Sequence, residues 1–270
     1  ILDFNSPALF SLLIPPAIGK PLERFARKVF LEKRKPSLLD IFVLKKLQKA
    51  LEERTAVACA AIEEEIAAAI EKEKVEAVGF KLWAGEGFTW IADVGARLKK
   101  RFPSVRFFGG GPQVDIFGHL LFLNLPFLDG LCYGEGEETI RELAKFVQTG
   151  KDPSAIPNMI WKEGTGHRKT SRVHISSLDS LPFPVYDAEI YRGIAGKLKM
   201  RVIDESRGCP NNCFFCIHPV KSGARREKSP ERVAGELAAC IERHGVRLFR
   251  YAGSSTPPGL LEKIAALILE

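Results

Sequence analysis

The stretch at residues 207–216 reads Arg-Gly-Cys-Pro-Asn-Asn-Cys-Phe-Phe-Cys and holds three of the chain's six cysteines. Cys209, Cys213 and Cys216 have the spacing Cys-x3-Cys-x2-Cys. At this cysteine frequency, about 0.003 triplets with that spacing are expected by chance, so accident does not explain the cluster. Three thiols on one short loop are typical of a metal site. The second half of the chain is therefore expected to be organised around this loop.

The number of thiols favours an iron–sulfur cluster over zinc. A structural zinc site needs four closed ligands, and no fourth cysteine or well-spaced histidine completes such a set. His218 lies only two residues after Cys216, too close in sequence to serve comfortably as a fourth tetrahedral ligand. A cluster held by three cysteines leaves one iron open for a substrate or cofactor. Phe214 and Phe215 are expected to exclude water from it.

The composition is that of an ordinary globular protein, with 270 residues, 46% of them hydrophobic and 27% charged. The net charge is +7, and basic residues gather around the cysteines. They are Lys197, Lys199, Arg201, Arg207, Lys221, Arg225, Arg226 and Lys228. This group suits an anionic ligand or cofactor, and equally a solvated basic face. No signature of nucleic-acid binding accompanies it.

The remaining cysteines indicate the cellular compartment, and the two ends of the chain indicate whether the sequence is complete. Cys59, Cys132 and Cys240 stand alone, as buried thiols do in a reducing compartment, so we expect a cytoplasmic protein. The apolar run at residues 7–18 is short and contains two prolines, which argues against a membrane span. The chain starts at Ile1 inside a strand pattern and stops within a helix pattern. We expect a piece of a longer protein, truncated at both ends.

Residues 75–149 alternate between strand and helix patterns. Strands are expected at 75–80, 105–108 and 128–132, and helices from an N-cap at Thr89 to Lys100, at 114–123 and at 139–148. This alternation predicts a doubly wound, Rossmann-like parallel sheet. Glycine loops at 109–112 and 133–137 follow two of the strands and therefore lie at the carboxyl edge, where such sheets bind ligands. A tight turn is the other reading of the first loop. Glu135 and Glu137 either reach a ligand or cap the following helix.

The chain divides into three parts on these patterns. Residues 1–150 form the Rossmann-like domain, with a helical insertion at about 20–74. Residues 151–197 contain a hairpin and a proline-rich linker. Residues 198–270 begin a second α/β domain: a strand at 198–204, the cysteines, a helix opened by Ser229 as N-cap and Pro230 as N1, and a strand at 247–251.

The stretch at residues 206–216 resembles the cluster loop of the radical S-adenosylmethionine (radical SAM) enzymes. The upstream half resembles the cobalamin-binding domain that precedes the radical domain in one large subgroup of that family. Four pieces carry this second resemblance in the family's order: Val-Gly-Phe at 78–80, Phe-Gly-Gly-Gly-Pro at 108–112, Tyr-Gly-Glu-Gly-Glu at 133–137 and Leu-Asp-Ser-Leu-Pro-Phe-Pro at 178–184. The resemblance implies a Rossmann-like domain followed by the first βα units of a partial TIM-like barrel.

The resemblance also implies the site residues. Cys209, Cys213 and Cys216 would ligate a 4Fe–4S cluster whose open iron chelates S-adenosylmethionine (SAM). Phe215, Tyr251, Gly253 and Ser254 would contact SAM, although the segment at 252–255 lacks the family's usual Gly-Gly-Glu. Cobalamin would lie against the two glycine loops, contacting Gly109, Gly110, Gly111, Gly134, Glu135 and Gly136. The chain lacks Asp-x-His-x-x-Gly, so no protein histidine is expected as the lower cobalt ligand.

The implied reaction is reductive cleavage of SAM, followed by methyl transfer to an unactivated carbon or phosphorus with cobalamin as the relay. Its partners would be an electron donor such as flavodoxin or ferredoxin and a small-molecule or natural-product-like substrate. Most of the radical barrel would follow Glu270, so this piece need not be active by itself. Two alternatives stay open. One is a radical SAM oxidoreductase, cyclase or methylthiolation-type enzyme without functional cobalamin, and the other is a non-catalytic metal-binding module.

Overall fold

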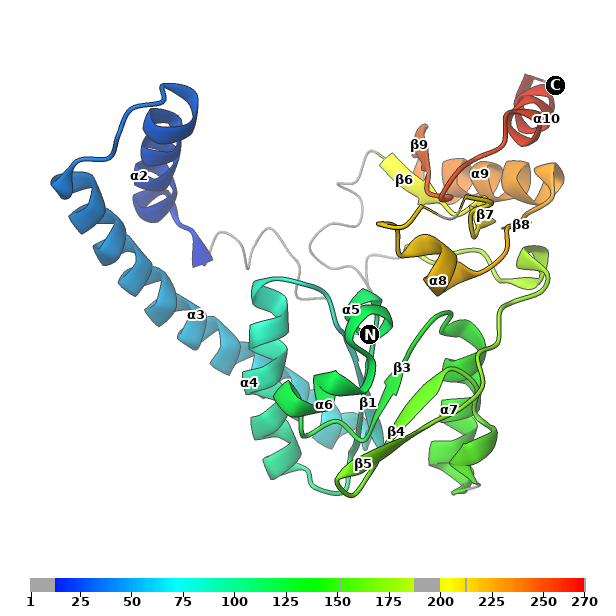
Figure 1. The fold of residues 1–270 in the computed structure, drawn as a ribbon, viewed down its shortest axis with the longest axis horizontal. Helices are drawn as coiled ribbons and strands as arrows, with labels where there is room; N and C mark the ends of the chain where they lie inside the picture. Colours follow the sequence, from blue (N-terminus) through cyan, green and yellow to red (C-terminus); the bar gives the residue numbers. More distant parts are fainter. Residues whose placement is uncertain (1–12, 151, 187–199, 212, 270) are drawn as a thin grey trace. The chain divides into compact units, whose positions relative to one another are not determined.

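The computed structural model describes residues 13–150, 152–186, 200–211 and 213–269 (Figure 1). The chain forms two compact units, one made of the described residues up to 73 and the other of residues 74–185 with those from 200 onward. The strand expected at residues 1–5 lies outside the described residues. None of the described helices combines the length and apolar character needed to cross a bilayer.

The first unit is helical. It contains α2 (Pro16–Ala26), the π-helical turn η1 (Arg27–Leu31) and the long helix α3 (Leu38–Glu73). Most of the helical insertion predicted at about 20–74 thus forms one uninterrupted helix, as expected for a segment rich in Ala, Glu and Leu. At its start, the Asp40 amide donates to Ser37 Oγ, 3.3 Å away, and the Ser37 amide donates back to the Asp40 carboxylate. These two contacts satisfy backbone donors that the first turn leaves free.

The second unit contains a five-stranded sheet in the order β1-β2-β3-β4-β5. Its strands are β1 (Ala77–Lys81), β2 (Arg106–Gly110), β3 (Gly130–Cys132), β4 (Met159–Glu163) and β5 (Gly166–Lys169). The first three are parallel, which confirms the predicted alternating βα arrangement. The predicted hairpin forms β4 and β5, and β4 pairs antiparallel with β3. The hairpin therefore extends the sheet.

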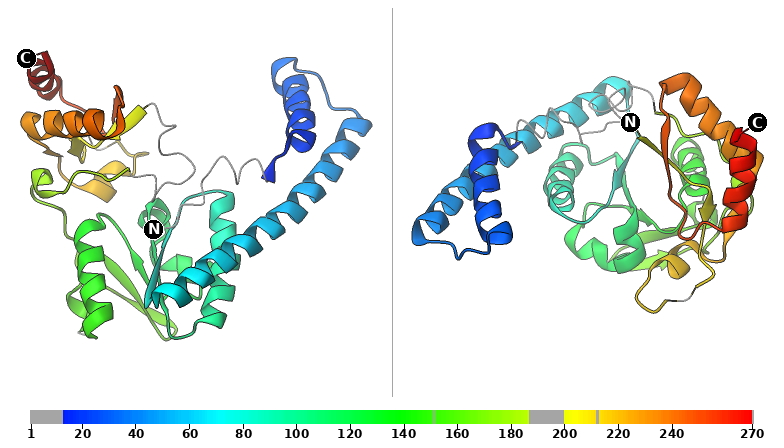
Figure 2. Two further views of the ribbon diagram at one scale, coloured as in Figure 1. Left: turned by 180° about the vertical axis from the view of Figure 1, so that it is seen from behind. Right: turned by 90° about the horizontal axis from the view of Figure 1, so that it is seen from above.

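The helices α4 (Glu86–Arg101) and α7 (Glu137–Thr149) cover opposite faces of the sheet (Figure 2). Phe108 of β2 packs with Leu143 and Phe146 of α7. The preceding residue, Phe107, points to the other face, where it meets Phe80 and Phe127 edge-to-face. The helix α4 packs there. A side chain at Gly95 of α4 would overlap Phe127. Alternation along one strand thus supplies both cores.

Two helix predictions for this sheet were wrong in detail. α4 begins at Glu86 after Gly85, whose φ of 99° ends the preceding loop, so Thr89 lies inside the helix. The helix expected at 114–123 is broken at Gly118, which has a φ of 54°. It consists of α5 (Pro112–Phe117), the 3-10 turn η2 (Gly118–Leu120) and α6 (Leu121–Asn124). A glycine at positive φ sets the helix start in the first case and breaks the helix in the second.

The part of the second unit from residue 200 onward is a separate βα series. The parallel strands β6 (Met200–Ile203) and β9 (Leu248–Tyr251) are connected through α9 (Pro230–His244), and α10 (Pro258–Leu269) follows. Ile203, Val233, Leu237, Leu260 and Ile264 form its core. Between β6 and α9 lie β7 (Ser206–Arg207), α8 (His218–Ser222) and β8 (Arg226–Glu227).

Helix α9 begins as predicted. The Arg232 amide donates to Ser229 Oγ at 3.1 Å, Pro230 is the first helical residue, and Gly245 ends the helix in the left-handed conformation. The Ser229 amide in turn donates to Asp179 Oδ1 at 2.9 Å. Asp179 belongs to the 3-10 turn η4 (Leu178–Ser180), so the proline-rich connection is bonded to the start of α9. The short turn η3 (Pro153–Ala155) lies between α7 and β4.

Candidate functional site

The cysteines lie on a loop that is closed at its base. β7 and β8 form an antiparallel ribbon in which Arg207 pairs with Arg226, and we call the intervening residues 208–225 the cysteine loop. Gly208, its first residue, has a φ of 81°, and a Cβ there would lie 2.4 Å from the Ala224 carbonyl oxygen. Only glycine fits this closure without displacing backbone. The sequence of the ribbon thus fixes where the loop begins and ends.

The three thiols share the loop without converging. Cys213 is exposed, Cys209 and Cys216 are half-buried, and all three are free thiols. The Cys216 amide donates to the Cys213 carbonyl at 3.0 Å, so these two lie on one turn. Among the residues that the structure describes, no three Cys, His, Asp or Glu side chains gather closely enough to hold a metal ion. The donor set itself, three thiols on a short turn-containing loop, has the chemistry that suits an iron–sulfur cluster.

The two phenylalanines of the loop differ from expectation. Phe214 is 99% exposed and Phe215 is 80% exposed, and the two rings contact each other edge-to-face. They do not cover the thiols in this structure, contrary to the prediction that they exclude water. A Phe-Phe pair is typical of buried positions, but an exposed loop offers these rings no core to pack against.

The first glycine loop (residues 109–112) lies where β2 ends. A Cβ at Gly109 would lie 2.7 Å from Leu82 Cδ1 and about as close to two further leucine side chains. At Gly111, φ is 118° and a Cβ would lie 2.8 Å from the Leu82 carbonyl oxygen. Gly110, in contrast, has room for a Cβ. Two of the three glycines are thus required by the approach of this loop to the segment after β1.

A largely apolar cavity of about 330 Å³ opens beside this loop. It lies between the segment that follows β1 and the helices that follow β2. Its lining residues are Ala84, Gly85, Phe88, Gln113, Phe117, Leu120, Leu121 and Asn124. The position, at the carboxyl ends of two parallel strands, is one where sheets of this type bind ligands.

The second glycine loop (residues 133–137) follows β3 and opens α7. Gly134 has a φ of 68°, and its amide donates to Asp115 Oδ1 of α5 at 2.7 Å. Burial raises the pKa of Asp115 above its ordinary value. Burial likewise raises the pKa of the Cys132 thiol, at the end of β3, to about 11. This loop is therefore tied by a polar contact to the helix that follows the first glycine loop.

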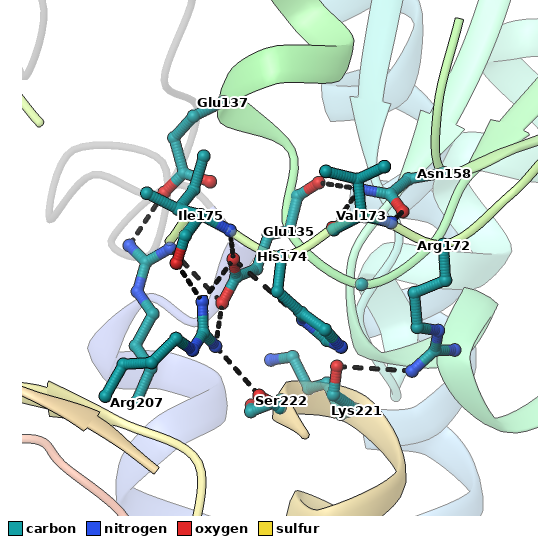
Figure 3. A network of polar contacts seen from close by, with 12 residues as sticks. Glu135, Glu137, Asn158, Arg172, Val173, His174, Ile175, Arg207, Lys221 and Ser222 are labelled. Atoms are coloured by element: carbon teal, nitrogen blue, oxygen red, sulfur yellow. Dashed lines mark hydrogen bonds and ion pairs between the residues drawn. The ribbon is translucent and has the colours of Figure 1, made fainter. Parts of the chain in front are cut away.

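Glu135 of the second glycine loop is the centre of a polar network (Figure 3). Its side chain is only 8% exposed, and Arg226 binds it with both terminal nitrogens, Nη2 to Oε1 at 2.6 Å and Nη1 to Oε2 at 2.9 Å. The Ile175 amide donates to Oε2 at 2.7 Å. Burial raises the pKa of Glu135, but these hydrogen bonds outweigh it and the net pKa lies below the ordinary value. The carboxylate faces the arginine, so it does not cap α7.

Arg207 forms a second connection from the ribbon to the same loop. Its Nη2 donates to Glu137 Oε1 at 2.7 Å and its Nε to Asp204 Oδ2 at 2.8 Å, while Nη1 lies 3.7 Å from Glu135 Oε1. Burial lowers the pKa of the Arg207 guanidinium, but hydrogen bonds to Glu137 and Asp204 outweigh it, and the net pKa is raised. Glu137 therefore bonds an arginine of the ribbon.

The loop after β9 surrounds a fully buried carboxylate. Glu205 Oε2 accepts hydrogen bonds from the amides of Ala252 and Gly253, at 3.1 and 3.0 Å, and its Oε1 accepts from Thr256 Oγ1. A Cβ at Gly253 would overlap the Glu205 carboxylate. Ser254 Oγ lies 2.9 Å from His218 Nδ1 of α8. Of the residues predicted to contact SAM, the structure places Gly253 and Ser254 beside Glu205 and the cysteine loop.

The structure shows what several of the basic residues near the cysteines contact. Arg207 and Arg226 bind acidic side chains, Arg225 pairs with Glu227 at 3.0 Å, and Lys228 pairs with Glu236 at 2.6 Å in the interior. These four cations are therefore neither a simple solvated face nor free for an anionic ligand. Lys197 and Lys199 lie outside the described residues. Sequence reasoning missed Glu205, because no local pattern distinguishes it from the other acidic residues before the cysteines.

The comparison with protein families gives one match. Residues 45–144 match the B12 binding domain family. The match begins within α3 and ends within α7, so it includes β1, β2 and β3 together with both glycine loops.

Individual proteins of similar sequence match a larger part of the chain than the family does. An uncharacterized methyltransferase (PH0819) of Pyrococcus horikoshii is 34% identical over 143 residues, which is 51% of this chain and 31% of the relative. The anaerobic magnesium-protoporphyrin IX monomethyl ester cyclase of Synechocystis is 26% identical over 167 residues, 57% of this chain and 32% of the relative. The chain thus spans about a third of the length of the curated relatives it matches.

A solved structure shares the fold. The cobalamin-dependent S-adenosylmethionine radical enzyme OxsB, in its complex with aqua-cobalamin and S-adenosylmethionine, matches with a TM-score of 0.61 at 18% identity. The match covers 77% of this chain and 30% of that one. The predicted fold class, a Rossmann-like sheet followed by the first βα units of a partial barrel, is confirmed.

Proposed function

Because the chain fits the family of radical SAM enzymes that carry a cobalamin-binding domain, we propose that the whole protein cleaves SAM reductively and transfers a methyl group to an unactivated centre. The proposal depends mainly on one observation. Three free thiols share one loop at the carboxyl end of β6, beside the domain that matches the B12 binding family. A metal loop at the carboxyl end of a barrel-type strand is where such folds place their chemistry.

Cys209, Cys213 and Cys216 would hold a 4Fe–4S cluster, and Phe215, Tyr251, Gly253 and Ser254 would contact SAM. When bound, the cluster would supply one electron to cleave SAM into methionine and a 5′-deoxyadenosyl radical, and cobalamin would relay a methyl group taken from a second SAM molecule, which leaves as S-adenosylhomocysteine. The Gly253 amide already donates to Glu205, so this glycine would offer SAM its carbonyl group and the close approach of its backbone.

Cobalamin would bind at the carboxyl edge of the sheet, against Gly109, Gly110, Gly111, Gly134, Glu135 and Gly136. The steric room at Gly110 and the neighbouring apolar cavity support this placement. The tight packing of Gly109 and Gly111 supports an indirect role for these two, in which they bring the loop into position for the ligand.

The decisive test is anaerobic reconstitution of the full-length protein with iron, sulfide and hydroxocobalamin. We expect about four irons and four sulfides per chain, absorbance near 400 nm and one bound corrin. Cys213→Ala should abolish the cluster and the formation of 5′-deoxyadenosine together. Cys240→Ala, which removes a buried thiol outside the cysteine loop, should leave both intact. One zinc per chain without cluster absorbance would refute the proposal in favour of a non-catalytic metal-binding module.

The likeness to an anaerobic cyclase favours one second candidate, a radical SAM oxidoreductase or cyclase without functional cobalamin. The same reconstitution separates the two candidates. A protein that holds the cluster and cleaves SAM but takes up no corrin would be of the second kind.

The remaining proposals concern partners. A small-molecule or natural-product-like substrate and an electron donor such as flavodoxin or ferredoxin fit this chemistry, with no nucleic acid involved. Cys132 and Cys240, two of the single cysteines outside the cysteine loop, are free thiols and support a reducing compartment such as the cytoplasm.

A further inference from the structure

Two arginines stand on either side of the cysteine loop, and both reach the second glycine loop. Arg207 directly precedes the loop and Arg226 directly follows it, and they are register partners on the β7–β8 ribbon. Arg226 binds Glu135 and Arg207 binds Glu137. The base of the metal loop is therefore bonded on both strands to the loop that ends β3.

The contacts leave little freedom at Glu135. Both carboxylate oxygens accept from Arg226, and Oε2 also accepts from the Ile175 amide. Arg226 Nη1 also donates to the Ile175 carbonyl at 2.6 Å, and its Nη2 to the Ser222 carbonyl at 2.8 Å. Three chain segments thus meet at one ion pair: the second glycine loop, the connection at Ile175 and the end of the cysteine loop (Figure 3).

The type of interaction matters as much as the number of contacts. A bidentate arginine–carboxylate pair fixes direction as well as distance, which a lysine does not do. Burying two charges costs desolvation energy, so such a pair is a poor means of gaining stability alone. Its geometric precision suits a role in holding two loops at a set separation.

We propose that Glu135, Arg207 and Arg226 form a positioning clamp that holds the cysteine loop against the second glycine loop. In the protein with its cofactors, the clamp sets the separation between the iron–sulfur cluster and cobalamin. This part of the inference rests on the proposed function. The residues of the clamp are positioning residues, since they contact one another, the acidic side chains of Glu137 and Asp204, and the backbone. Glu135, although part of a glycine loop expected to bind cobalamin, acts through the arginines.

The first measurement needs no cofactor. In the full-length apoprotein, Glu135→Gln and Arg226→Lys keep the size or charge of the side chain but break the bidentate pair. Amide hydrogen exchange should become at least fivefold faster at Ile175 and in the cysteine loop, while β3 amides exchange as in the wild type. Glu138→Gln removes a more exposed pair with Arg141 on α7 and should change nothing. Unchanged exchange at Ile175 and in the cysteine loop in both clamp variants would overturn the proposal.

The second measurement reports position. In the reconstituted protein, electron paramagnetic resonance detects magnetic coupling between a reduced cluster and cob(II)alamin. We expect Arg226→Lys, which alters the pair from the side that is not expected to contact cobalamin, to bind both cofactors but to lose or alter the coupling. In Glu135→Gln, loss of cobalamin binding together with wild-type hydrogen exchange would show that Glu135 acts on cobalamin alone, and would overturn the clamp. If the wild type takes up no cobalamin, the proposed function fails, and the exchange measurement alone decides whether the clamp exists.

Discussion

The two glycine loops follow neighbouring parallel strands, yet they are held in different ways. The first packs against Leu82, through its backbone carbonyl at Gly111 and its side chain at Gly109. The second is held by polar groups, with Asp115 on the Gly134 amide and Arg226 on the Glu135 carboxylate. Both contain a glycine at positive φ, and both precede a helix.

The difference shows that one sequence pattern serves two structural purposes. In the first loop, missing side chains let the sheet close on the segment after β1. In the second, a buried charge reaches the ribbon at the base of the cysteine loop. Apolar packing tolerates small shifts, whereas a bidentate ion pair does not. The second loop is therefore the one suited to coupling the two halves of the unit.

The largest expected effect comes from removing the charge at Glu135. Glu135→Leu leaves the Arg226 guanidinium, now 15% exposed, without its counter-charge in the interior. Breaking a buried pair in this way typically costs about 3–5 kcal/mol in the free energy of unfolding. Urea denaturation at pH 7 measures the loss.

Glu138→Gln, on the helix α7 that follows the second glycine loop, is the matched control. Glu138 pairs with Arg141, whose side chain is 62% exposed, and such pairs contribute little. We expect its unfolding midpoint to equal that of the wild type. Equal losses in the two variants would show that the second glycine loop is held no more tightly than the surface.

A smaller effect is expected at the first glycine loop. Gly111→Ala places a Cβ 2.8 Å from the Leu82 carbonyl oxygen at a φ of 118°, a conformation that costs roughly 1–3 kcal/mol for other residues. Gly110→Ala is the control, because its Cβ would meet only ordinary contacts at 3.7 Å, and we expect a loss of about 0.5 kcal/mol or less. Thermal unfolding of both variants compares them. A greater loss at Gly110 would contradict the packing account.

The parallel sheet, the caps of α9 and the position of the cysteine loop were predictable, because each depends on local signals. Hydrophobic alternation marks the strands, and Ser229, Pro230 and Gly245 mark the helix ends. The broken helix after β2 was missed because Gly118 reads as a tolerated interruption until its φ of 54° is known. Local sequence signals therefore predict where the helices and strands lie, but not where a helix is broken internally.

The polar connections could not be predicted, because they join residues far apart in sequence. Glu135 and Arg226 are 91 positions apart, and neither has a partner that local patterns reveal. The sequence offers several arginines near the cysteines and several acids near the glycines, with no rule for pairing them. Glu205 shows the same limit, since its partners other than the adjacent Ser206 lie in a loop 47 or more positions away.

The smallest expected effect is a pH dependence of stability that distinguishes the second glycine loop from the first. The pKa of Glu135 in the folded protein lies below its ordinary value of 4.5. A carboxyl with a depressed pKa stabilises the fold fully above its unfolded pKa, and this contribution is lost as pH falls through the folded pKa. The difference in unfolding free energy between wild type and Glu135→Gln should thus be constant from pH 7 to about 5.5 and shrink below pH 4.5. Gly111→Ala changes no titrating group, so its difference from wild type should stay level over the same range. Urea titrations at each pH test both, and a Glu135→Gln difference that grew in acid would contradict the assignment of Glu135 as the charged partner of Arg226.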